Sequence, residues 1–146
     1  MANGATHDQI TLTLAKSAAI AALLPLPWDI PWPVAAGIYA GLWLSPDLDL
    51  AKCNARKRWR DFAWLGWIWW PYAKLIPHRS WASHAPIIST AGRLAYVGGL
   101  AFIVALAVGQ GESMLDWVGH YQAAALAFAT GLAIADTGHW AADRWG

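Results

Sequence analysis

Histidine and aspartate side chains stand near the ends of apolar stretches in this 146-residue chain, at four places that are far apart in sequence. Imidazole nitrogens and carboxylate oxygens are usual ligands of zinc, and of manganese or iron when oxygen ligands dominate. We therefore predict a divalent-metal site, with zinc as the first expectation and manganese or iron as alternatives. The candidate ligands are His7, Asp47, Asp49, His78, His84, Asp136 and His139.

The spacing of these residues indicates how they could converge. Asp136 and His139 are three residues apart and share one face of a helix. The two aspartates of segment 47–49 alternate in an extended turn, so both point the same way. His78 and His84 cannot share a helix face, which places His78 in a loop and His84 at a helix start. The whole set exceeds the needs of one tetrahedral ion. It suits two ions, or one ion with further carboxylates that orient the histidines.

Four apolar stretches of helical character must position these side chains. About 20 apolar residues are needed to cross a bilayer. The third and fourth stretches meet this length, the first is marginal and the second is short. We predict an all-α fold, a membrane-embedded up-down bundle of about four helices in one domain covering 1–146. A hairpin of the last two spans, with the first half lying on the surface, is the alternative. The stretches are approximately 6–24, 34–44, 85–108 and 116–135, and we expect the last helix to end near Gly138.

Helix order alone gathers the candidate ligands. In an up-down bundle, the start of helix one, the end of helix two, the start of helix three and the end of helix four share one end. All four groups fall there, and only His120 falls at the opposite end. Taken singly, His7, Asp8 and Asp143 are better explained as capping, turn or solvent-facing residues. The convergence of all four groups, and not any single residue, favours a metal site.

The composition is typical of a membrane protein. The chain is 58% hydrophobic and 13% charged, against about 25% charged in soluble domains. It contains 12 tryptophans, a residue that settles at membrane–water boundaries. The single Cys53 excludes an internal disulfide and a thiolate metal site. No basic segment precedes the first apolar stretch, so we expect that stretch to remain in the mature protein.

Segment 51–83 carries most of the positive charge of the chain, against the single acid Asp61. The connections expected at the opposite end hold Asp29, Glu112 and Asp116 and no lysine or arginine. The positive-inside rule therefore places this segment, both termini and the metal site on the cytoplasmic side of a bacterial inner membrane. The cations are Lys52, Arg56, Lys57, Arg58, Arg60, Lys74 and Arg79.

Within that segment, residues 62–72 are rich in tryptophan and too short to span a bilayer. They are typical of an interfacial segment, with the neighbouring cations drawn to anionic lipid. The simpler interpretation, an aromatic belt with topogenic charge and no recognised ligand, is favoured here. The lipid bilayer is thus the expected partner. Nucleic-acid binding is not expected, because membrane anchoring explains both the charge and the aromatics.

Arg79 lies between the two loop histidines, and a guanidinium beside a metal is suited to hold a phosphate or carboxylate. Ser80 and Ser83 are possible nucleophiles, but no base–orienter pattern accompanies them. We expect Ser83 to cap the third helix.

Lys16 and Arg93 each follow a histidine of the site by nine residues, inside apolar stretches. At about 1.5 Å per residue, both lie about 13 Å from the site end. Two roles remain open: lining a cavity under the site, or snorkelling to the membrane surface.

Several motifs follow one another in an order that resembles a known family. They are Thr-His-Asp at 6–8, Ser-Pro-Asp-Leu-Asp at 45–49, Trp-Pro-Tyr at 70–72 and the run Pro-His-Arg-Ser-Trp-Ala-Ser-His at 77–84. This order resembles a bacterial and cyanobacterial family described only as metal-binding membrane proteins, whose late aspartate matches Asp136. The likeness extends over nearly the whole chain. More distantly, the pattern is similar to inner-membrane proteins labelled metal-dependent hydrolases. The resemblance implies metal binding at His7, Asp47, Asp49, His78, His84 and Asp136, and implies no mechanism.

Two functions of different classes are consistent with these features. The first is a metal-dependent hydrolase acting at the membrane face on a phosphate ester or lipid-linked substrate. In that case Asp47 or Asp8 would act as the base and Arg79 would hold the anion. The second is a non-catalytic membrane protein in which the metal joins helix ends. Transport of the ion is less well supported, because transporter sites usually lie near the middle of the membrane.

Overall fold

The structure, a computed structural model, describes residues 4–23, 30–50, 52–78 and 80–145, without the side chains of residues 81 and 82. The described residues form helices and no strands, which confirms the predicted all-α class. In chain order the elements are α1 (Gly4–Ala21), α2 (Pro31–Ala40), the 3-10 helix η1 (Pro46–Asp49), α3 (Asn54–Ala63), the 3-10 helix η2 (Leu65–Ile68), α4 (Trp69–Leu75), α5 (Trp81–His84), α6 (Pro86–Ala107), α7 (Gly111–His120) and α8 (Gln122–Trp145).

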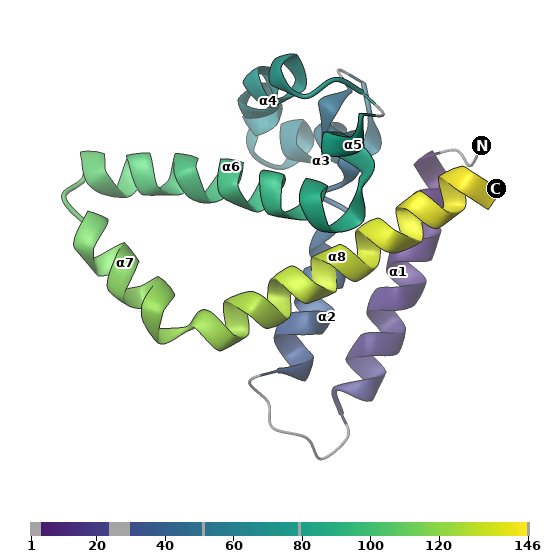
Figure 1. Cartoon of the computed structure of the whole chain (residues 1–146), viewed down its shortest axis with the longest axis horizontal. Helices are drawn as coiled ribbons and strands as arrows, with labels where there is room; N and C mark the ends of the chain where they lie inside the picture. Colours follow the sequence, from purple (N-terminus) through teal and green to yellow (C-terminus); the bar gives the residue numbers. More distant parts are fainter. Residues whose placement is uncertain (1–3, 24–29, 51, 79, 146) are drawn as a thin grey trace.

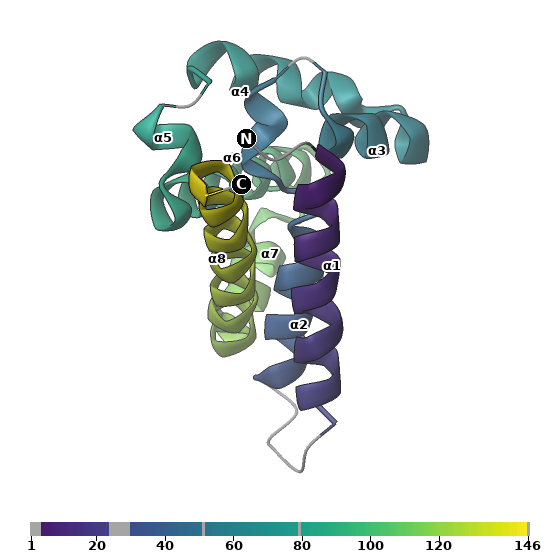
Figure 2. The same ribbon diagram turned by 90° about the vertical axis from the view of Figure 1, so that its right-hand side faces the viewer.

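Helices α1, α2 and α8 pack against one another in all three pairs and form a bundle (Figures 1 and 2). Small side chains fill its centre. Ala15, Ile38 and Ala135 are buried there, and Leu14 and Val34 pack around them. Because Ala15 and Ala135 are small, the helix axes can lie close together.

The closest approach in the bundle lies between α2 and α8. A Cβ atom on Gly37 would lie 2.0 Å from the carbonyl oxygen of Phe128, and one on Gly131 would lie 2.0 Å from that of Val34. The two backbones therefore touch at these glycines, and no larger residue fits. Since η1 follows α2 directly, this contact also sets the distance between η1 and the last turns of α8.

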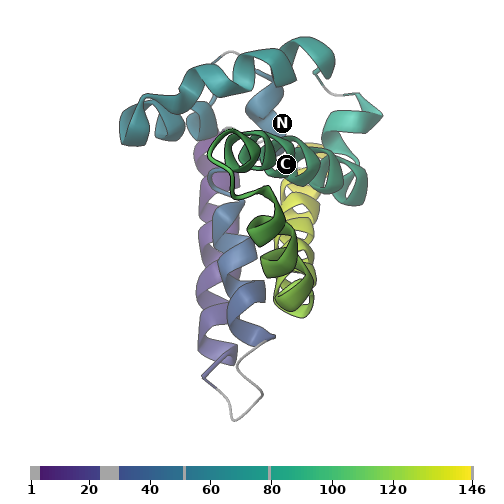
Figure 3. The ribbon, with the colours of Figure 1, turned by 90° about the vertical axis from the view of Figure 1, so that its left-hand side faces the viewer.

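The short helices α3, α4 and α5 cover the end of the bundle that carries both termini (Figures 2 and 3). A second core lies under this cap and is built around Trp69, which is fully buried. The rings of Trp59 and Tyr72 meet Trp69 edge-on, at 5.6 and 5.7 Å between centroids. Leu44, Leu48 and Leu132 complete the core. The cap is thus packed onto the bundle through its aromatic residues.

The expected four-helix up-down bundle is not the arrangement observed. Helix α6 packs against α5, α7 and α8, and it runs across the bundle instead of along it (Figure 1). The expected fourth helix is also divided, because α7 and α8 meet at a bend of 78°. Helix α8 then continues past Gly138, where we expected it to end. Gly138 is a packing position: a Cβ there would meet Leu14 and Ile10 of α1 at 3.1 and 3.2 Å.

Among the described helices, α6 alone is long and apolar enough to cross a membrane. A second candidate arises if the bent pair α7 and α8 is counted as one span. The predicted spans at 6–24 and 34–44 correspond to α1 and α2, which do not meet the same criterion. Ile103, Val104 and Leu106 of α6 remain 63%, 62% and 56% exposed.

Replacing Gly37 by alanine should destabilise the fold, because its methyl group would overlap a backbone carbonyl that cannot rotate away. We expect a loss of about 1–3 kcal/mol in the free energy of unfolding, measured by urea denaturation with circular dichroism. Gly98→Ala in α6 is the matched control, since a Cβ there meets nothing within 4 Å. That variant should be neutral or stabilised by up to about 1 kcal/mol. Equal stabilities for the two variants would contradict the proposed backbone contact.

Candidate metal centre

Every segment that was expected to supply ligands places a candidate ligand at the end of the bundle that α3, α4 and α5 cover. His7 lies near the start of α1, Asp47 in η1, His84 at the end of α5, and His139 near the end of α8. The turn that presents Asp47 is specified locally. Pro46 begins η1, and Oγ of Ser45 accepts a hydrogen bond from the backbone N–H of Asp47 at 3.3 Å.

Four side chains form the middle of the site. Nε2 of His139 lies 3.6 Å from Oδ1 of Asp47 and 3.5 Å from Oδ2 of Asp143. Nε2 of His84 lies 3.9 Å from each of the same two oxygens. These separations are too long for hydrogen bonds. Ligands about 2.1 Å from one tetrahedral ion lie roughly 3.4 Å apart, so the spacing is close to that of ligands sharing an ion.

Burial provides an independent test of whether these residues fit a metal. Nε2 of His84 and Nε2 of His139 are both buried, and neither has a hydrogen-bond partner. A buried polar atom without a partner costs free energy, so such atoms are rare unless a ligand satisfies them. Both atoms face carboxylate oxygens, which themselves need a positive partner. The donor set therefore fits a divalent ion.

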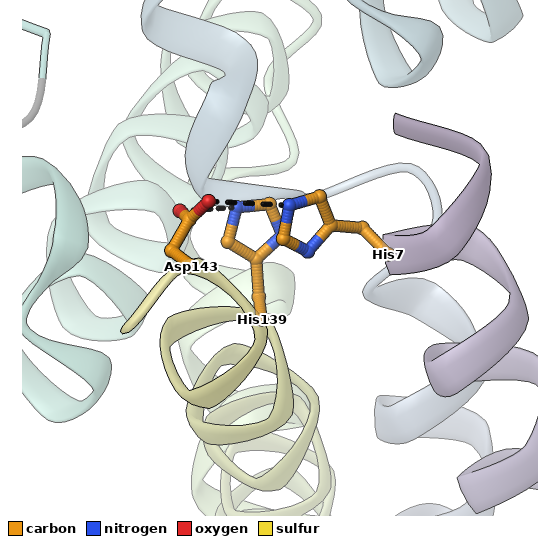
Figure 4. A group of neighbouring side chains, drawn as sticks. All are labelled: His7, His139 and Asp143. Atoms are coloured by element: carbon orange, nitrogen blue, oxygen red, sulfur yellow. Dashed lines mark ion pairs between the residues drawn. The ribbon is translucent and has the colours of Figure 1, made fainter. Parts of the chain in front are cut away.

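Two further histidines extend the site on either side. The ring of His7 stacks on that of His139 at 3.8 Å between centroids, and its Nε2 lies 3.3 Å from Oδ1 of Asp143 (Figure 4). On the other side, the ring of His78 meets that of His84 edge-on at 5.4 Å.

The donors divide into two adjacent groups, each with its ligand atoms within 4.8 Å of one another. One group consists of His7, His139 and Asp143, and the other of Asp47, His78 and His84. The site can accordingly hold one ion in the middle or one ion in each group.

The orientation of His84 is set by Ser83, which is completely buried. Nδ1 of His84 lies 2.8 Å from Oγ of Ser83, and Oγ of Ser83 donates to the carbonyl oxygen of Ser80 at 3.1 Å. With that hydroxyl proton engaged, Nδ1 of His84 is the donor, which leaves the lone pair on Nε2 for a metal. Ser83 does not cap α6 as expected, because the N-cap of α6 is Ala85.

Asp49 orients His78 in the same way. Its buried Oδ1 lies 3.0 Å from Nδ1 of His78. Asp49 was predicted as a ligand; the structure directs its Oδ1 to a histidine, while its Oδ2 is buried without a hydrogen-bond partner. A carboxylate that accepts from Nδ1 leaves Nε2 of the imidazole available and raises its basicity.

The titration of the central residues suits metal binding. Burial lowers the pKa of His84, so its imidazole is neutral at neutral pH. Burial raises the pKa of Asp47, but the neighbouring imidazoles, His139 foremost, lower it by more, and the net shift is downward. A neutral imidazole and an ionised carboxylate are the protonation states that a metal requires.

Asp136, another predicted ligand, belongs to neither group. Thr90 and Arg93 of α6 both donate to its Oδ2, and all three residues are buried. The physical reason is that Arg93 is fully buried in α6 and requires a counter-charge. Arg93 therefore neither snorkels nor lines an open cavity, while Lys16 is exposed.

Other sequence candidates belong to neither donor group. Oδ2 of Asp8 accepts from Arg58 at 2.6 Å and from Asn54 at 3.0 Å. Arg79 lies outside the described residues, and His120 ends α7 away from the site.

Asp143 is the site residue that sequence reasoning assigned to a different role. It contacts His7 and His139, although we had favoured a turn or solvent-facing position. The available signal was its spacing, four residues after His139 and therefore on the same helix face. It was missed because we expected α8 to end near Gly138.

An all-α fold whose helix ends bring histidines and carboxylates together defines a helical protein with a candidate divalent-metal centre. Over residues 2–146 the chain matches the family of uncharacterized metal-binding proteins DUF2227, and it belongs to that family. No curated protein and no solved structure matches it. The family confirms metal binding, as predicted, while the kind of ion stays a prediction.

Removing two central donors should abolish stoichiometric metal binding. We expect the His84→Ala, His139→Ala double variant to lose its bound metal in elemental analysis. Its affinity should fall by more than the roughly 10- to 100-fold that loss of an orienting partner costs. His120→Ala, which changes an exposed histidine of α7, should keep wild-type metal content. Unchanged metal in the double variant would exclude this centre.

Ser83→Ala tests whether the hydroxyl orients His84. The variant should lose about 10- to 100-fold in metal affinity, since Nδ1 of His84 would be left without its partner. Ser17→Ala, at an exposed position of α1, is the control. Titration calorimetry with Zn²⁺ measures the metal affinity of both variants. If Ser83→Ala binds zinc as tightly as Ser17→Ala does, the orienting role is wrong.

Proposed function

We propose that this protein is a metal-dependent hydrolase of a phosphate ester, working at the cytoplasmic face of a bacterial inner membrane. The observation that carries the proposal is an excess of metal donors beside an open polar cavity. A structural metal site is closed by four protein ligands, whereas a catalytic site keeps a position accessible to solute.

The cavity has a volume of about 240 Å³ and reaches two residues of the centre, His7 and Asp47. Ser45, Lys52 and Asn54 also line it. A solute in this cavity would meet donors of the centre, Lys52, and the Asp8 carboxylate, which is already paired with Arg58. An anion such as a phosphate group suits that combination of charges.

A divalent ion in the centre would polarise a phosphoryl oxygen and acidify the attacking water. The remaining roles belong to the chain. His84 and His139 direct their Nε2 atoms towards the middle of the centre, and Ser83 orients the ring of His84. Asp47, ionised at neutral pH, can take up a proton from water on the cavity side. This supports the role of Asp47 over Asp8, whose carboxylate is occupied by Arg58 and Asn54.

A second anion-holding group was predicted at Arg79. It lies outside the described residues, and its role remains part of the proposal on sequence grounds. His78 and Ser80, which flank it, are close to the centre or to its orienting serine. Lys52 is the described cation that can share this role.

Membrane attachment is supported by the apolar surface of α6. In the most apolar part of α6, 17% of the residues are buried, which is low for the core helix of a soluble protein. The cationic segment lies in the cap beside the centre, and cations favour the cytoplasmic face. We therefore place the cap and the centre at that face.

The proposal is tested by turnover and by access to the ion. Protein loaded with Zn²⁺ or Mn²⁺ should release phosphate from at least one member of a panel of aryl phosphates, phosphodiesters and lipid phosphates. His84→Ala should lose this activity and His120→Ala should keep it. Bound Mn²⁺ should also enhance the relaxation of solvent protons, because an open site exchanges with water.

The competing function, a metal that joins helix ends, predicts the opposite results. No panel member would be hydrolysed, and bound Mn²⁺ would leave solvent relaxation unchanged. That set of results would overturn the hydrolase proposal while keeping the metal centre.

A further inference from the structure

A second cavity, larger than the one beside the centre, lies between α3 and η2. Its volume is about 540 Å³. Lys52, Arg56, Lys57 and Arg60 line it, and among its described lining residues none is acidic. A cavity with this concentration of positive charge attracts a compact anion, and several lysine and arginine donors suit the oxygens of a phosphate group.

Arg56 gives this cavity a fixed wall. Its Nε donates to the carbonyl oxygen of Gly66 and its Nη1 donates to that of Leu50, both at 3.2 Å. These bonds hold η2 against the start of α3. Lys57 and Arg60 are three residues apart on α3, so they lie on the same face, and both are exposed. The pair between Arg60 and Asp61 is 3.3 Å long and exposed, so it competes only weakly for the guanidinium.

The rim of the cavity is aromatic. Trp64 and Trp67 line it and are 85% and 70% exposed. Trp64 has a φ of 57°, in the left-handed region that favours glycine. A large apolar side chain is thus held outward at a position where its backbone is strained. Phe62, 77% exposed, stands two residues before it. Indole rings beside cations match the boundary between lipid headgroups and acyl chains.

The geometry points to this cavity as a binding site for the phosphate headgroup of an anionic phospholipid. Charge complementarity accounts for the phosphate, and the exposed tryptophans account for the adjoining acyl chains. A nucleic acid would also meet cations and aromatic rings. The lipid is favoured because the apolar helix α6 extends from the same small protein.

The position of the cavity also suggests the class of substrate. Lys52, Cys53 and Asn54 line both this cavity and the one that reaches His7 and Asp47. A lipid phosphate bound here lies next to the entrance of the centre. We infer that the hydrolysed ester is a phospholipid phosphate; this step alone rests on the proposed function, whereas headgroup binding does not.

Binding can be measured with the full chain in a non-ionic detergent. Titration calorimetry with soluble dihexanoyl phosphatidylglycerol should show binding, and dihexanoyl phosphatidylcholine and inorganic phosphate should bind at least about tenfold more weakly. Binding should persist after the metal is removed with a chelator. Phosphate binding as tight as the lipid, tighter binding of a single-stranded oligonucleotide, or loss of lipid binding with the metal would each overturn the headgroup site.

Two double variants distinguish a site from general charge attraction. Lys57→Gln, Arg60→Gln should weaken phosphatidylglycerol binding roughly thirtyfold, from the contribution of two cations. Lys74→Gln, Arg144→Gln removes the same charge from two cations that lie over Trp70 and Trp140, outside the cavity. It should change binding less than about twofold. Equal losses in both would overturn the site.

Folding and catalysis are checked separately. Lys52→Gln changes a cation of the cavity that lies outside α3. It therefore tests the site if the Lys57→Gln, Arg60→Gln variant fails to fold, and it should also weaken lipid binding. If the lipid binds as expected but metal-loaded protein hydrolyses only water-soluble phosphates, the substrate inference fails and the headgroup site stands. If the lipid binds and no phosphate ester is hydrolysed, the proposed function fails instead.

Discussion

The contact between the backbones of α2 and α8 is the constraint on which the site depends. Gly37 and Gly131 allow the two helices to touch, and any Cβ at either position would overlap a carbonyl oxygen of the other helix. Helix α2 leads within a few residues into η1, which carries Asp47, and α8 ends with His139 and Asp143. The distance of 3.6 Å from His139 to Asp47 is therefore a consequence of a packing contact farther down the bundle.

Buried polar groups at this end are arranged in two different ways. Arg93 and Asp136 neutralise each other beneath the site, with Thr90 as a third partner. The Nε2 atoms of His84 and His139 have no such partner. Burying an unsatisfied nitrogen costs on the order of 1–3 kcal/mol, so the metal-free centre is destabilising until an ion occupies it. Metal binding and stability are coupled here, because a bound ion satisfies these donors.

The cap serves two purposes at once. Its inner aromatic residues, centred on Trp69, pack onto the bundle. Helix α5 contacts α6 and η1 and brings His84 against His139 of α8. The outer tryptophans and cations of the cap surround the cavity between α3 and η2. The same tryptophan-rich segment thus builds the core that positions the centre and presents the surface that we assign to lipid. Trp69 and Trp64 are close in sequence and are 0% and 85% exposed.

Residue types and helix order were sufficient to predict an all-α protein and to name candidate ligands that the structure brings together, namely His7, Asp47, His78, His84 and His139. Ligand chemistry and helix ends can be recognised locally. The direction of each side chain could not be predicted in the same way. Asp136 turns to α6 because a buried arginine lies there, and Asp143 joins the site because α8 continues past Gly138 to pack on α1. The bend between α7 and α8 and the path of α6 across the bundle are likewise long-range outcomes. Sequence determined which groups could bind a metal, and tertiary packing decided which of them face one another.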